Sequence, residues 1–143
     1  HDVMRALKQA GIKVGMVTNA FQPMLLREIE LGIDGHGILE YFTDCRVSAA
    51  DVGYLKPHKA IFDHALEKIG TTPEETVFVG DDPEADIVGA QGVGMKAVLR
   101  YTERRPFFDE DEIKPDAIVR DLHQLLPILD QWYPGWRSTN INQ

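Results

Sequence analysis

The chain has 143 residues, of which 43% are hydrophobic and 27% charged, and its formal net charge is −8. These values are typical of one globular domain with a substantial core. The negative charge argues against nucleic acid or an anionic membrane as a partner, and no apolar run is long enough to span a bilayer. Cys45 is the single cysteine, so no internal disulfide can form, and a reducing, cytoplasmic location is expected.

Short apolar runs alternate with helical segments along the chain. The expected helices cover residues 1–10, 22–31, 59–69, 83–91 and a terminal segment that Asp121 caps and Pro127 kinks or splits. The expected strands cover residues 12–18, 41–48, 76–80, 97–99 and 116–119, and residues 49–57 and 102–115 are expected to be loops. This alternation predicts a single α/β domain with a mostly parallel sheet between two layers of helices.

The segment at residues 76–86, TVFVGDDPEAD, organises the rest of the chain. Its apolar run ends at Gly80, which predicts a strand buried on both faces, and three carboxylates follow at Asp81, Asp82 and Asp86. Carboxylates crowded at the carboxyl end of a strand repel one another unless a cation such as Mg²⁺ joins them. The alternative is a solvated acidic loop that caps the N-terminus of a helix.

Other polar residues are expected at the same edge of the sheet. Thr18 and Asn19 end one strand, and Lys56 lies in a loop before Pro57. Taken singly, such residues are more often structural or solvated. Together with the acids they form a set suited to phosphoryl transfer, in which Thr18 binds phosphoryl oxygens and Lys56 neutralises developing charge. In this interpretation Asp81 ligates Mg²⁺, and Asp86 holds either Lys56 or a metal-bound water.

Three segments carry a resemblance to a known family. They are VTN (17–19), LKPHKAIFDHALEKIG (55–70) and VGDDPEADIVGAQGVGM (79–95), which together resemble the haloacid dehalogenase (HAD) superfamily of hydrolases. The resemblance implies a Rossmann-like three-layer sandwich. It assigns Thr18 to the second motif, with Asn19 beside it at the substrate, Lys56 to the third motif, and Asp81 with Asp86 to the Mg²⁺-organising fourth motif. The role of Asp82, next to these acids, stays open.

The family's first motif, DxDx[TV], which supplies the nucleophilic aspartate, does not occur in the 143 residues. We therefore expect residues 1–143 to be the C-terminal portion of one HAD-like core domain, inactive alone, with the first strand and any cap upstream. In the family that strand lies between those ending at Thr18 and Gly80. The gap is expected to be filled by a second copy of the chain, by a retained upstream peptide, or by direct pairing of the two neighbours.

The resemblance favours a Mg²⁺-dependent phosphatase that acts on a small phosphorylated metabolite. The family's haloacid dehalogenases use no metal and carry serine and asparagine in the fourth motif, where this chain has acids. A 2-haloacid dehalogenase-like hydrolase and a non-catalytic binding module of the same fold remain the alternatives. A phosphoacceptor receiver domain would have its acids first, whereas here they come last. Trp132, Tyr133 and Trp136 are expected to pack on the core, with a partner-binding patch as the alternative, and Cys45 is expected to be buried.

Overall fold

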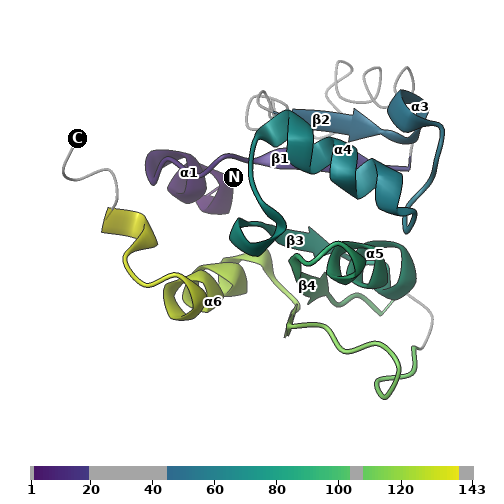
Figure 1. Ribbon diagram of the computed structural model, residues 1–143. Coiled ribbons are helices and arrows are strands. Elements are labelled where there is room, and N and C mark those ends of the chain that lie inside the picture. Colours follow the sequence, from purple (N-terminus) through teal and green to yellow (C-terminus); the bar gives the residue numbers. More distant parts are fainter. Residues whose placement is uncertain (1, 20–44, 104–107, 139–143) are drawn as a thin grey trace, which may run out of the picture.

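The computed structural model describes residues 2–19, 45–103 and 108–138, which form two parallel sheets flanked by helices (Figure 1). Strand β1 (Gly15–Thr18) pairs with β2 (Cys45–Ser48), and β3 (Val77–Gly80), β4 (Lys96–Arg100) and β5 (Ala117–Val119) pair in that order. Every one of these pairings is parallel. The helical elements are α1 (Asp2–Gln9), α3 (Ala49–Val52), α4 (Lys59–Ile69), η2 (Pro73–Glu75), η3 (Pro83–Val88), α5 (Gly89–Gly92), η4 (Leu122–Gln124), α6 (Leu125–Trp132) and η5 (Trp136–Ser138). The predicted parallel α/β architecture is thus confirmed.

Strand β4 is the centre of the three-layer arrangement. Its side chains alternate between the two faces of the sheet, as expected for an extended strand. Ala97 and Leu99 join a core cluster with α4 and α5, whereas Val98 joins a second cluster with α1 and α6. Figure 1 shows α4 and α5 on one side of β4, and α1 and α6 on the other. Helices therefore cover both faces of the sheet that carries the acidic segment.

Helix α4 joins the two sheets. Its residues Ile61 and Phe62 are fully buried and share one cluster with Cys45 and Val47 of β2 and with residues of β4. Cys45 is buried, as predicted. Because a single apolar cluster contains residues from both sheets, the packing of α4 helps to fix the position of one sheet relative to the other.

The strands at the facing edges differ from expectation. The segment before Gly80 was expected to be buried on both faces, yet all of β3 is half-buried, because among the described residues β3 pairs only with β4. Among the described residues β1 likewise pairs only with β2, and its Val17 is half-buried. The single expected sheet is therefore two sheets, and direct pairing of β1 with β3 does not occur between the described segments.

Several local elements refine the prediction. The expected loop at 49–57 begins with α3, where Asp51 Oδ2 accepts hydrogen bonds from the backbone N–H of Ser48 at 2.7 Å and from its hydroxyl at 3.3 Å. Asp121 caps the 3-10 turn η4 that leads into α6, and α6 begins at Leu125, two residues before Pro127. The expected helix at 22–31 and the first half of the expected strand at 41–48 lie outside the described residues.

The C-terminal aromatic residues pack on the core. Trp136 is buried, and Trp132 and Tyr133 pack against the same cluster as α1 and α6, as expected. Within residues 2–19, 45–103 and 108–138, no helix combines the length and apolar character needed to cross a bilayer.

Candidate active site

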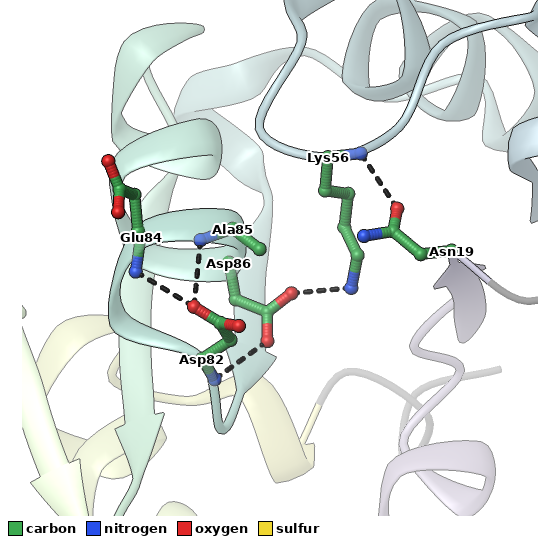
Figure 2. A network of polar contacts seen from close by, with 6 residues as sticks. All are labelled: Asn19, Lys56, Asp82, Glu84, Ala85 and Asp86. Atoms are coloured by element: carbon green, nitrogen blue, oxygen red, sulfur yellow. Dashed lines mark hydrogen bonds and ion pairs between the residues drawn. The ribbon is translucent and has the colours of Figure 1, made fainter. Parts of the chain in front are cut away.

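The ion pair between Lys56 and Asp86 is the centre of the candidate site (Figure 2). Lys56 Nζ lies 2.5 Å from Asp86 Oδ1, and only 12% of the lysine side chain and 5% of the aspartate side chain are exposed. Lys56 comes from the loop before α4, and Asp86 from η3, which follows β3. Burying two charges costs desolvation free energy, and only a close contact between them offsets this cost. This ion pair is the contact that the first of the two roles considered for Asp86, that of holding Lys56, requires.

The end of β1 fixes the main chain of Lys56. The backbone N–H of Lys56 donates a hydrogen bond of 2.7 Å to Asn19 Oδ1, and Asn19 directly follows Thr18, the last residue of β1. With its oxygen on that N–H, the Asn19 amide turns its NH₂ group away from the Lys56 backbone (Figure 2). Lys56 is thus bonded through its main chain to the segment after β1 and through its side chain to the segment after β3.

The turn after β3 is built on two aspartates. Asp82 Oδ1 accepts hydrogen bonds of 3.0 Å from the backbone N–H groups of Glu84 and Ala85, which is N-cap geometry for η3. The backbone N–H of Asp82 donates to Asp86 Oδ2 at 3.0 Å. A side chain at Gly80 would overlap Asp86, so the glycine lets the carboxylate lie against the strand end. Element η3 is a π-helical turn, a conformation common at functional sites.

The oxygen donors at this edge suit a hard cation only in part. Asp81 directly follows β3, and its oxygen chemistry fits Mg²⁺, which often uses one or two carboxylates and completes its shell with water or phosphate. Asp86 is engaged through both oxygens, and Asp82 through Oδ1. Among the described residues no three acidic, histidine or cysteine side chains form a group able to hold a metal ion. Asp81 can therefore serve as one ligand of the ion, and the described residues alone do not form a complete metal site.

The structure places the six predicted residues at two strand ends and in the contacts that link these ends. Thr18 and Asn19 lie at the end of β1, Asp81 and Asp82 at the end of β3, and Lys56 and Asp86 form the link between these two ends. The sequence analysis missed the structural role of Asn19, which it assigned to substrate alone. No pattern in the sequence indicates that this amide accepts from a backbone group 37 positions away.

The cap of α4 also escaped the sequence analysis. His58 Nδ1 accepts a 3.0 Å hydrogen bond from the backbone N–H of Ala60, and its ring stacks on Tyr54 with centroids 3.9 Å apart. Histidine is not among the preferred N-cap residues, so helix-start rules give no signal here. His58 therefore supports the helix that follows Lys56.

Several known proteins are similar to this chain in sequence and fold. The profile of the haloacid dehalogenase-like hydrolase family matches residues 1–94. The pyrophosphatase PpaX of Bacillus mycoides is 35% identical over 132 residues, which are 92% of this chain and 58% of that protein. The chain thus spans a little over half the length of the curated relatives that it matches.

Solved structures agree with this assignment. A HAD phosphatase from Thermococcus onnurineus superposes with a TM-score of 0.76 at 31% identity, covering 90% of this chain and 55% of that one. The HAD hydrolase YfnB from Bacillus subtilis, bound to magnesium, has a TM-score of 0.76 at 27% identity, with coverages of 90% and 54%. A 2-haloacid dehalogenase from Pseudomonas syringae has a TM-score of 0.71 at 31% identity, with coverages of 92% and 52%. With a family profile over its first 94 residues and these folds over nine-tenths of its length, the chain belongs to the haloacid dehalogenase-like hydrolases.

Proposed function

We propose that the whole protein is a Mg²⁺-dependent phosphatase of small phosphorylated molecules, and that this chain supplies the part of its active site that binds and neutralises phosphate. The observation that carries the proposal is the buried ion pair of Lys56 with Asp86, bonded through Asn19 to the end of β1. The pyrophosphatase relative and the phosphatase structure support phosphate as the group acted on.

Each residue has a distinct part in the proposed reaction. The Thr18 hydroxyl and the NH₂ group of Asn19 bind phosphoryl oxygens at the end of β1. The Lys56 ammonium neutralises the charge that develops on the transferred group, and Asp86 holds that ammonium in place. Because Asp86 keeps the cation fixed before substrate binds, little reorganisation is needed during the reaction.

The metal is assigned to the end of β3. Asp81 is the proposed ligand from this chain, and Asp82 is the neighbouring candidate. When bound, Mg²⁺ would supply positive charge that neutralises phosphoryl oxygens. The magnesium-bound YfnB structure supports this assignment, as does the oxygen chemistry of the two side chains.

The nucleophile is proposed to come from another part of the whole protein. The 143 residues contain no DxDx[TV] sequence, and the matched region is 58% of the PpaX relative's length. We therefore expect the chain alone to hydrolyse no phosphate ester. We also expect the whole protein to act in the cytoplasm, where Cys45 stays reduced.

A further strand is proposed to lie between β1 and β3. Met16–Thr18 of β1 and all of β3 are half-buried, and each strand is paired on one side only among the described segments. A parallel strand from the rest of the protein would cover these edges, with a second copy of this chain as the alternative. Size-exclusion chromatography with light scattering distinguishes them, since only the second copy gives a dimer of the isolated chain.

The proposal is tested on the whole protein with pyrophosphate, a panel of phosphate monoesters and 2-chloropropionate, each with Mg²⁺ and with EDTA. We expect phosphate release that EDTA abolishes. In the Lys56→Ala variant kcat is expected to fall about 10²–10³-fold, as on removing one preorganised charge-stabilising donor. Lys59→Ala is the matched control, because that lysine is 73% exposed and pairs only loosely with Asp63 at 3.8 Å. Chloride release without metal would instead support a dehalogenase, and undiminished turnover in Lys56→Ala would refute the proposed role.

A further inference from the structure

The Lys56 ammonium contacts a second group besides Asp86. Its Nζ lies 5.7 Å from the centroid of the Phe78 ring, within the range of cation–π attraction. Phe78 is in β3, two residues before Gly80, and is half-buried against the cluster that contains α4. The ammonium therefore lies near both a carboxylate, from η3, and an aromatic ring, from β3.

The Phe78 ring is itself fixed by packing. It meets Phe62 of α4 in an edge-to-face contact, with centroids 5.2 Å apart and planes at 67°. Phe62 is fully buried, and it lies so close to Gly89 that any side chain there would overlap its ring. A contiguous series of contacts thus runs from Gly89 through Phe62 and Phe78 to Lys56.

The ring supplies a constraint that the carboxylate alone does not. A lysine side chain has four rotatable bonds, and a point charge can meet a carboxylate from many directions. Asp86 Oδ1 sets the distance of the ammonium, but a ring face beside it limits the directions from which Nζ can approach. The carboxylate and the ring together therefore restrict the position of the cation more than either does alone.

We propose that Phe78 is a positioning residue for Lys56, whose ring holds the ammonium at the point where phosphoryl charge develops. This role rests on the proposed function of Lys56. It requires an aromatic ring at position 78, and an aliphatic side chain of similar volume would keep the packing but lose the contact.

The test uses Phe78→Leu and Phe78→Tyr in the whole protein, with Val77→Ala as the control. Val77 lies on the same strand but packs against the cluster of the opposite face, so its variant loses core packing without approaching Lys56. We expect Phe78→Leu to lower kcat about 3- to 30-fold with little change in KM, and Phe78→Tyr and Val77→Ala to stay within about twofold of wild type.

A second readout does not depend on activity. In NMR spectra the ring current of Phe78 displaces the Lys56 Hε protons, and this displacement is expected to be lost in Phe78→Leu and kept in Phe78→Tyr. If it persists in Phe78→Leu, or if the leucine and tyrosine variants lose kcat equally, the positioning role is wrong. If the displacement behaves as expected while the whole protein releases no phosphate, the contact stands and the phosphatase proposal fails instead.

Discussion

Replacing either Lys56 or Asp86 alone is expected to lower the free energy of unfolding by more than half of the loss caused by replacing both. The two charges lie 2.5 Å apart with exposures of 12% and 5%. At an effective dielectric constant of about 20 their attraction is about 6–7 kcal/mol, which is offset by a desolvation cost of several kcal/mol per ion. A single substitution loses the attraction but leaves the other charge buried, so each is expected to cost about 3–5 kcal/mol.

A double-mutant cycle measures this interaction. The variants are Lys56→Met, which keeps the length of the side chain, Asp86→Ala, and their combination. Because the double variant leaves neither charge buried, its loss of unfolding free energy is expected to be smaller than the sum of the single losses by about 2 kcal/mol or more. The exposed pair of Lys59 and Asp63 is the control, with an expected coupling of about 0.3–0.5 kcal/mol.

The assay is urea unfolding of the four proteins, followed by far-UV circular dichroism at neutral pH. Equal m-values across the set are required before the free energies are compared. If the losses for Lys56→Met and Asp86→Ala add to within about 0.5 kcal/mol, the two side chains do not interact as the structure has them. The geometry on which the proposed site rests would then be wrong.

The remaining predictions concern the backbone around the site and the pH dependence of the fold. Gly80→Ala is expected to displace Asp86 and lower both the Tm and kcat, whereas Gly92→Ala, where nothing lies within 4 Å, should leave kcat unchanged. His58→Ala removes the cap of α4 and should cost about 0.5–1 kcal/mol in urea unfolding, with His58→Asn restoring much of it. The hydrogen bond from the backbone N–H of His123 lowers the pKa of Asp121 below its ordinary value. Its contribution to stability is therefore present above that value and lost as the pH falls through the lowered pKa, so Asp121→Asn should flatten the fall of Tm in acid.

The predictable part of the site follows from strand geometry. Parallel strands end at one edge of a sheet, so residues after successive strands are neighbours without further information. This is enough to expect Asn19, Lys56 and Asp86 in the same part of the molecule. The glycine at position 80 marks the strand end, but the sequence does not say that its missing side chain makes room for a carboxylate. The site's location was therefore predictable, and its hydrogen bonds were not.

The unpredicted features depend on contacts between distant segments. The division into two sheets reflects the edges of β1 and β3, and a strand pattern does not say whether a neighbour is present to pair with it. The contact of Phe78 with Lys56 joins a strand to a loop 22 positions earlier in the sequence, and an apolar residue in a strand is most simply a core residue. The hydrogen bond of Asn19 to the Lys56 backbone was not predicted for the same reason, because a side-chain bond to a remote backbone group has no local sequence pattern.

Lys56 has two separable roles in this arrangement, and they bear on how its variants are interpreted. Its backbone N–H is bonded to Asn19, and a substitution of its side chain leaves that bond possible. Its ammonium is bonded to Asp86 and contacts Phe78, and the same substitution removes both interactions. The kinetic loss in Lys56→Ala therefore combines the missing charge with any shift of the segment after β3. Lys56→Met in the cycle reports the structural part as a free energy of unfolding, and this loss is to be compared with the loss of kcat in the same variant.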